Sequence, residues 1–261
     1  MKKALKAVFA AALLATAATA GATPSTTFWT PATTYSQPYL VPHITYDTYV
    51  AEKGFLANDY GLTVGVLPFE KLQGEVGIDL FYPGISQDNF YLNGKLTLPE
   101  NAFSPYQPAL SVGAQSIGFK KDYSNYNHYY AVVAKTFPVV GNIAVGGYYG
   151  GNKVLYATLN TASTDAVKTD RAGFMASWTS ADINIGLPGL NKIVFLADYA
   201  SGKNAFGAVG GGIGLYFTPT VDILTGPVWF NDKDGAKAIF GSDFMWSVQL
   251  DVDFDLIKKK T

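Results

Sequence analysis

The 261-residue chain has no cysteine, which excludes disulfide bonds and thiolate metal sites. It has little charge, since Asp, Glu, Lys and Arg make up 15% of the residues, against roughly 25% in an ordinary soluble domain. Beyond residue 22 it has no long apolar run, which excludes a membrane protein built of spanning helices. A basic surplus is also missing, with 19 Lys and Arg against 20 Asp and Glu. Because binding to phosphate backbones relies on basic side chains, the sequence predicts no nucleic-acid partner.

The N-terminal residues predict export. Three lysines among the first six residues precede a small, apolar run, and Ala-Gly-Ala at 20–22 fits a small-x-small cleavage site. The run is shorter than the ~20 residues that a spanning helix needs, so we expect a cleaved signal peptide over 1–22 rather than an anchor. Residues 23–40 contain three prolines and predict an extended N-terminal arm.

Aromatic side chains and glycine are plentiful: the chain has 17 Tyr, 17 Phe and 27 Gly. Residues 246–256 alternate strictly between an apolar row and a polar row. The apolar row is Trp246, Val248, Leu250, Val252, Phe254 and Leu256, and the polar row is Ser247, Gln249, Asp251, Asp253 and Asp255. Successive side chains of a strand point to opposite faces, so this segment has one apolar and one acidic face. In an exported chain, this favours a barrel with lipid outside and water inside.

The rest of the chain can be divided into about twelve strands. They cover residues 43–50, 60–67, 74–82, 90–98, 109–119, 128–136, 142–150, 173–182, 192–201, 206–217, 221–230 and 244–256. Connections after even-numbered strands contain prolines and are mostly short, whereas several of those after odd-numbered strands are longer and more polar. This asymmetry is typical of outer-membrane barrels. The sequence therefore predicts an all-β fold, a single antiparallel transmembrane β-barrel over 41–257, with both termini periplasmic and a basic tail at 258–261.

Three segments carry a resemblance to known proteins. The alternating Val-Gln-Leu-Asp-Val-Asp-Phe at 248–254 is similar to the last strand of small, porin-like bacterial outer-membrane β-barrels. Together with Trp-Thr-Pro at 29–31 and Gly-Lys-Asn-Ala-Phe-Gly at 202–207, it resembles an uncharacterised family of exported barrels over most of the mature chain. The resemblance implies an outer-membrane location, contact with outer-membrane lipids and recognition by the barrel-assembly machinery, but no particular activity. The chain departs from the pattern because Ile257 and three lysines follow the last strand.

Strand parity assigns a set of charged residues to the lumen. These candidate lumen-facing residues are Asp47, Glu75, Asp79, Lys95, Asp198, Asp251 and Asp253. A charge turned to lipid at the midplane costs several kcal/mol, so these groups must meet water or one another. One hypothesis is a porin-like channel for passive diffusion of small hydrophilic solutes through an acidic lumen. The other is an interior filled by paired charges, in which the arm at 23–40 can also plug the opening. Twelve strands fall between the filled 8-stranded and the open 16-stranded barrels.

The residues that could carry chemistry support no enzyme, cofactor or metal site. His43 and Asp47 share a strand face about 13 Å apart, too far to hydrogen-bond. His128 is predicted to be a loop or aromatic-belt residue, and the Asp-Lys-Asp-Gly of 232–235 lacks the later ligands of a calcium loop, so it is predicted to be a solvated turn. Two alternatives to the channel remain. The first is a closed structural or adhesive barrel that presents tyrosines on its outer loops, and the second, less favoured, is an outer-membrane lipid-modifying enzyme. The loop tyrosines are Tyr123, Tyr126 and Tyr156.

Overall fold

The computed structural model describes residues 26–52, 54, 56–82, 89–153 and 170–254. The predicted signal peptide, the basic tail and Tyr156 lie outside the described residues. No helix within the described ranges is both long enough and apolar enough to span a membrane.

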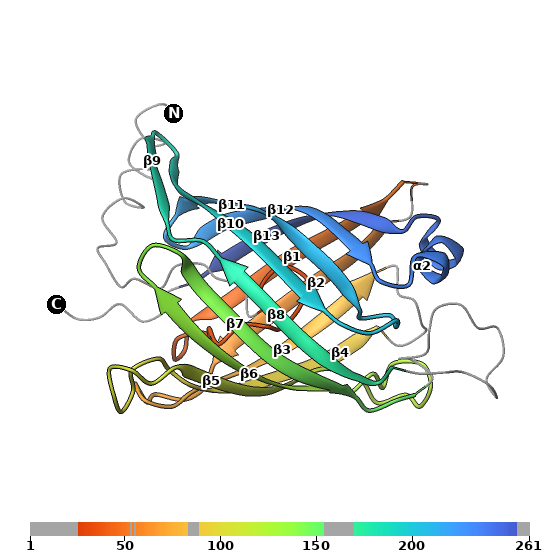
Figure 1. The fold of residues 1–261 in the computed structure, drawn as a ribbon, viewed down its shortest axis with the longest axis horizontal. Coiled ribbons are helices and arrows are strands. Elements are labelled where there is room, and N and C mark those ends of the chain that lie inside the picture. The colour runs from red at the N-terminus through yellow and green to blue at the C-terminus, as the bar shows by residue number, and fades with distance from the viewer. Residues whose placement is uncertain (1–25, 53, 55, 83–88, 154–169, 255–261) are drawn as a thin grey trace, which may run out of the picture.

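In these ranges, thirteen strands and one short helix follow one another. They are β1 (Pro42–Ala51), β2 (Leu56–Gly65), β3 (Gln73–Tyr82), β4 (Phe90–Leu98), β5 (Ala109–Ile117), β6 (His128–Phe137), β7 (Gly141–Gly150), β8 (Ala172–Thr179), β9 (Ile183–Leu187), β10 (Leu190–Ala200), β11 (Ala208–Thr218), β12 (Val221–Phe230), α2 (Lys233–Phe240) and β13 (Phe244–Asp253). Neighbouring strands pair antiparallel, and β13 pairs back onto β1, so twelve strands close into a barrel (Figure 1). The predicted twelve-stranded antiparallel barrel is confirmed.

Most strand boundaries shift by one to three residues from the prediction, and three differences change the description of the fold. Strand β2 begins at Leu56 rather than at residue 60. The short β9 pairs with the start of β10 across a tight turn, near which Gly186 and Gly189 have positive φ, and this hairpin extends beyond one end of the barrel (Figure 1). The predicted charged loop over 231–243 contains α2, and the Asp232 side chain caps this helix by accepting the Gly235 N–H at 3.3 Å. The solvated-turn prediction is therefore wrong at Asp232, because helix capping uses its carboxylate.

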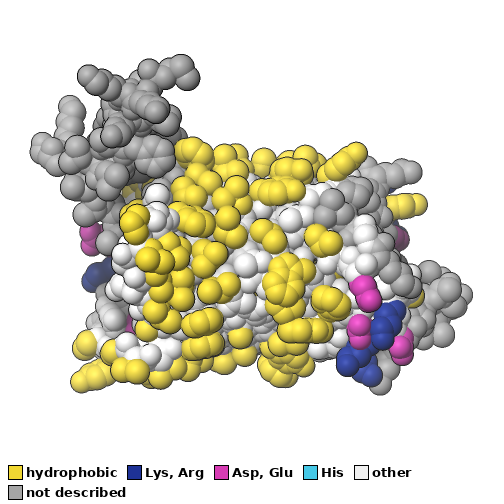
Figure 2. Space-filling view, turned by 90° about the horizontal axis from the view of Figure 1, so that it is seen from above, with side chains coloured by type: hydrophobic (Ala, Val, Ile, Leu, Met, Phe, Trp, Pro, Cys, Tyr) yellow, Lys and Arg dark blue, Asp and Glu magenta, His cyan; other side chains and the backbone are white. Residues whose placement is uncertain are grey.

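The outer face of the wall is apolar and the inner face is polar. In β13 and at the residue after it, Trp246, Leu250 and Phe254 are 47%, 38% and 42% exposed, whereas Ser247 and Asp251 are fully buried. Exposed apolar side chains continue around the wall, including Ile44, Tyr46, Leu62, Val76, Ile78, Leu80, Leu96, Val112, Val145 and Phe195. Figure 2 shows hydrophobic side chains over the side of the barrel, with acidic and basic groups toward its two ends and most of them at one end. The wall strands are 8 to 11 residues long, close to the ~9–11 that a tilted membrane strand needs.

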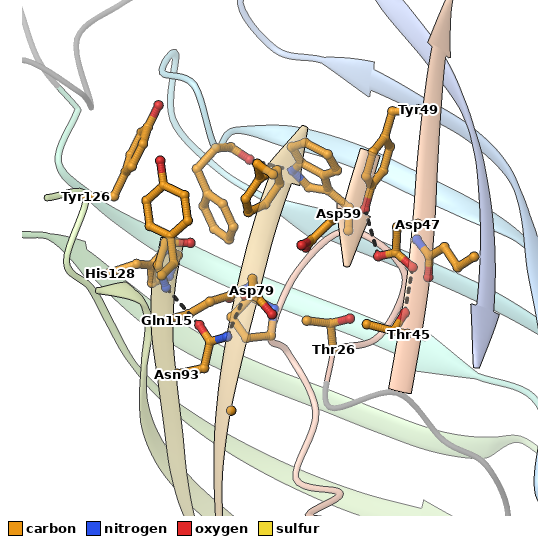
Figure 3. Close-up of a pocket in the computed structure, with 18 of the residues that line it drawn as sticks. Thr26, Thr45, Asp47, Tyr49, Asp59, Asp79, Asn93, Gln115, Tyr126 and His128 are labelled. Carbon is orange, nitrogen blue, oxygen red and sulfur yellow. Dashed lines mark hydrogen bonds between the residues drawn. The ribbon is translucent and has the colours of Figure 1, made fainter. Parts of the chain in front are cut away.

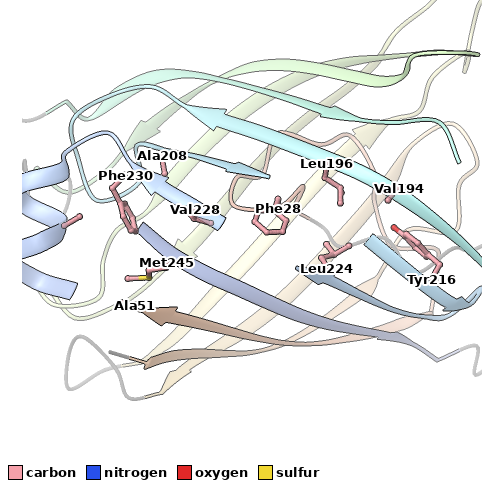
Figure 4. Packing of buried hydrophobic residues seen from close by; sticks show 11 residues of the cluster. Phe28, Ala51, Val194, Leu196, Ala208, Tyr216, Leu224, Val228, Phe230 and Met245 are labelled. Carbon is pink, nitrogen blue, oxygen red and sulfur yellow. The ribbon is translucent and has the colours of Figure 1, made fainter. Parts of the chain in front are cut away.

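The described part of the N-terminal arm lies inside the barrel. Phe28 is 1% exposed and packs with inward-facing residues of the wall such as Leu196, Val228 and Met245 (Figure 4). Ala32 is fully buried in a second cluster, on the side of the wall that β6, β7 and β8 form. The arm therefore fills part of the lumen with apolar side chains, and the polar groups of the wall must be considered together with it.

Candidate functional site in the barrel lumen

Asp198 of β10 fastens the arm to the wall. Its Oδ2 accepts hydrogen bonds from the backbone N–H groups of Phe28, Trp29 and Thr30, at 3.1, 2.8 and 2.7 Å. Three donors on one carboxylate oxygen form charge-assisted hydrogen bonds, which are stronger than neutral ones. Gln249 adds a fourth contact, since its Nε2 donates to the Phe28 carbonyl at 2.7 Å. Asp198 therefore acts as an anchor for the backbone of the arm.

Glu75 of β3 holds both the arm and a neighbouring strand. Its Oε1 lies 3.1 Å from Nζ of Lys95 on β4, and its Oε2 accepts the backbone N–H of Gln37 at 2.7 Å. Both side chains of this ion pair are buried. Next along the arm, the Leu40 N–H donates to the Gly65 carbonyl at 2.9 Å. Two of the predicted interior charges thus pair with each other, and one of them also positions the arm.

His43 lies at the junction of the first and last strands. Its Nε2 is 3.1 Å from Asp251 Oδ1 and its Nδ1 is 2.9 Å from Asp253 Oδ1. Asp222 of β12 faces Asp251 in the strand register and is fully buried. Burial, followed by the nearby carboxylates with Asp253 first, raises the pKa of the Tyr35 phenol in the arm well above its ordinary value. These residues form a closed acidic group around one imidazole.

A cavity of about 280 Å³ lies between the arm and the wall (Figure 3). Asp47, Asp59 and Asp79 line it from β1, β2 and β3. Thr45 Oγ1 donates to Asp47 Oδ1 at 2.8 Å, and the amide of Asn93 donates to Asp79. The Tyr49 hydroxyl donates to the other Asp47 oxygen at 3.3 Å. No lysine or arginine is among the described residues that line this cavity.

Aromatic rings complete the lining. Phe81 and Tyr91 meet edge to face at 5.4 Å between ring centroids, and Tyr126 lies 6.2 Å beyond Tyr91. Burial, and then the neighbouring Tyr91, raises the pKa of Tyr126 to about 12. Tyr126 therefore lines the cavity instead of standing out on a loop, whereas Tyr123 is 53% exposed.

His128 is also an interior residue. It begins β6, is 2% exposed, and its ring meets Phe206 at 4.2 Å between centroids. The loop or aromatic-belt prediction is wrong, because the imidazole faces the interior and is buried against the ring of Phe206.

The structure distributes the seven predicted lumen residues among four places. Asp47 and Asp79 line the cavity, Glu75 pairs with Lys95, Asp198 holds the arm, and Asp251 and Asp253 bracket His43. Sequence reasoning missed Asp59, Asn93, Gln115 and Asp222. Asp59 was missed because the predicted strand began one residue after it. Asp222 could have been found from the alternation of residues 221–230, which turns it toward the interior.

A closed antiparallel barrel with an apolar outer wall and a polar, charged interior defines an outer-membrane β-barrel of the porin-like kind, and its location is the outer membrane. No protein-family model matches the chain, and no curated protein matches it.

Solved structures similar to the chain are outer-membrane porins and channels. The NanC porin in a rhombohedral crystal form has 9% identity and a TM-score of 0.49, over 82% of this chain and 100% of that one. The COG4313 outer membrane channel from Pseudomonas putida F1 has 10% identity and a TM-score of 0.38, over 84% and 97%. Salmonella typhi OmpF in complex with daunomycin has 10% identity and a TM-score of 0.39, over 82% and 96%.

Proposed function

We propose that the barrel is a narrow channel for passive diffusion of small hydrophilic solutes, and that it favours cations over anions. The observation that carries this proposal is the cavity between the arm and the wall, lined by Asp47, Asp59 and Asp79 and, among the described residues, by no lysine or arginine. Carboxylates in a low-dielectric passage concentrate the field and attract counter-ions. Because these three carboxylates project from β1, β2 and β3 into the cavity beside the arm, we propose that the solute path runs along these strands.

Conductance in planar bilayers tests the proposal. Refolded protein, checked by a fast-migrating folded band in unheated SDS gels, is expected to give conductance steps and a cation-selective reversal potential in a salt gradient. The double variant Asp47→Asn, Asp79→Asn is expected to lower the selectivity. Asp182→Asn, which changes a side chain that is 56% exposed, is the matched control. Folded protein without conductance steps contradicts the channel, and steps with unchanged selectivity contradict the path.

A closed structural or adhesive barrel is the second candidate, and the arm favours it. Thr30 and Ala32 are fully buried, and the arm is anchored through Asp198 and Glu75. Absence of steps from folded wild type, with steps appearing once the anchor is weakened, would support this reading.

We also propose that the outward row at the C-terminal strand faces lipid and is recognised by the assembly machinery. The row consists of Trp246, Val248, Leu250, Val252 and Phe254. Charged substitutions in it are expected to reduce the amount of folded barrel in cells. The control is the same substitution at Val139, which is 89% exposed in a turn. Ser247, on the opposite face of the strand, is unsuitable as a control because it is buried.

A further inference from the structure

We infer that the cavity between the arm and β1–β5 binds a small organic cation, a primary ammonium group attached to a compact apolar body. This inference rests on the proposed channel and names the class of solute that the channel holds. It is argued from the acceptor groups of the cavity, its aromatic walls and its size.

The carboxylates of the cavity are placed where they repel one another. Asp47 and Asp59 stand directly opposite in the register of β1 and β2, and Asp79 follows on β3 opposite Gly61. Like charges directly opposite in a sheet are destabilising. Thr45, Tyr49 and Asn93 relieve Asp47 and Asp79 only with neutral donors. A positive group between the three carboxylates would offset this repulsion.

Two oxygen atoms at the cavity lack donors. Asp59 Oδ1 and Gln115 Oε1 are buried and accept no hydrogen bond from the described residues. Both residues line the cavity, and Figure 3 shows them on separate strands of its wall. A buried acceptor without a donor costs free energy, so the cavity is complementary to a ligand that donates. An ammonium group carries three donors and no acceptor, and it satisfies both the charge and the hydrogen-bond requirement.

The rest of the lining suits an apolar body. Phe28 and Trp29 contribute from the arm, and Phe81, Tyr91 and Tyr126 from the wall and its loop. Aromatic faces attract a cation, and they bury apolar surface at the same time. The volume of about 280 Å³ is slightly below the roughly 300–1,000 Å³ of typical ligand pockets, so the ligand must be small.

A single metal ion fits these carboxylates less well. Among the described residues, no group of three or more His, Cys, Asp and Glu has the spacing that holds a metal ion. Calcium takes six to eight oxygen ligands at about 2.3–2.6 Å, which three such separated carboxylates do not provide. An ammonium group with a body of its own bridges a wider space.

Calorimetry on refolded protein in detergent micelles tests the inference without requiring conduction. The probe is 2-phenylethylammonium, compared with the neutral 2-phenylethanol, the anionic phenylacetate and calcium ion. Wild type is expected to bind the ammonium about tenfold or more tightly than the alcohol, because a charged hydrogen bond and ion pairing are lost with the neutral analogue. A titration of protein-free micelles corrects for partition of the probe, and Asp182→Asn protein is expected to bind the probe as wild type does.

The decisive variants are Asp59→Asn and Gln115→Leu, each verified as folded by its fast-migrating band. Asp59→Asn is expected to weaken ammonium binding about tenfold, and Gln115→Leu by a smaller factor, since only one neutral acceptor is removed. Equal binding of the alcohol and the ammonium, unchanged affinity in folded Asp59→Asn protein, or calcium binding that displaces the ammonium at equal concentration overturns the inference. Wild type that conducts ions but binds no ammonium refutes this inference and leaves the channel. Wild type that binds ammonium without conductance steps refutes the channel and leaves the binding site.

Discussion

Replacing the anchor of the arm, Asp198→Asn, is expected to release the arm from the wall. The substitution keeps the volume of the side chain and one acceptor oxygen, but the oxygen that faces the three N–H donors of the arm no longer carries a negative charge. In wild type the Oδ2 atom accepts all three, from residues 28, 29 and 30, at 2.7 to 3.1 Å. The variant retains the apolar contacts of Phe28, so the barrel itself is expected to fold.

The size of the effect follows from these hydrogen bonds. A hydrogen bond to a charged group contributes roughly 1.5–3 kcal/mol and a neutral one roughly 0.5–1.5, so loss of charge weakens each by about 1 kcal/mol. Three such bonds give about 3 kcal/mol, which raises the undocked fraction of the arm roughly 100-fold. Removing the charge also removes the cost of burying it, which favours the docked arm. We expect the weakening of the three hydrogen bonds to be the larger of these two free-energy changes.

A single cysteine measures the undocked fraction, because the chain has none of its own. Ser36 is suited to it, since this arm residue is 3% exposed and its hydroxyl accepts or donates no hydrogen bond among the described residues. In the Ser36→Cys background, labelling by a water-soluble maleimide is expected to be about 100-fold faster with Asp198→Asn, because labelling follows the open population when closing is fast.

The control is Asp182→Asn in the same background, a change at an exposed carboxylate that pairs with Lys192 at 3.0 Å. It is expected to leave the labelling rate unchanged. A rate for Asp198→Asn within twofold of the control, in protein that keeps its folded band, refutes the role of Asp198 as the anchor.

Two other predictions concern the arm and a turn. Gly65→Ala places a methyl group against the carbonyl oxygens of Gln37 and Pro38, so it is expected to speed the labelling of Ser36→Cys protein. Gly94→Ala is the control, because the nearest contact of its methyl group is 3.7 Å away, and it is expected to leave the labelling rate unchanged. Equal rates for the two variants would contradict the close fit of the arm. Burial raises the pKa of Glu100, but hydrogen bonds from Lys135 and Thr136 outweigh it and lower that pKa below its ordinary value. The contribution of Glu100 to stability is therefore present above about pH 4.5 and lost as the pH falls through the folded-state pKa. The contribution is small because the Glu100–Lys135 pair is partly exposed. Denaturant titrations in which wild type and Glu100→Gln protein show the same acid dependence would refute this prediction.

The parts of the fold that depend on local pattern could be predicted from the sequence. The alternation of residues 246–256 gave the face of each side chain in β13, and proline-rich connections marked the turns between strands. The glycine-rich segment over 207–216 brings the wall close to the arm, since a side chain at Gly210 would meet Phe28 and Trp29. The β9 extension was missed because its five residues resemble a turn more than a strand.

The partners of the interior charges could not be predicted, because they depend on register between strands. His43 meets Asp251 and Asp253 only because β13 pairs with β1 at that offset, and a shift by one residue turns a whole row of side chains to the other face. The path of the arm could not be predicted from its composition either, because the backbone N–H groups that bind Asp198 are present in every residue except proline. Strand parity placed charges inside the barrel, but neighbouring elements decide which of them are paired.

The difference between interior carboxylates that the fold pairs and those that it leaves without a donor is the reason to propose a functional site at β1, β2 and β3. Where the fold pairs a lumen carboxylate, the partner belongs to this chain: backbone N–H groups for Asp198, Lys95 for Glu75, and His43 for Asp251. Asp59 faces an open cavity, and its Oδ1 receives no donor from the described residues. A charge that costs stability and is reachable from a cavity is more informative about function than one that the fold has enclosed. Asp59→Asn is therefore expected to stabilise the barrel against denaturant while it weakens ammonium binding, and a loss of both stability and binding would show that Asp59 serves the fold instead.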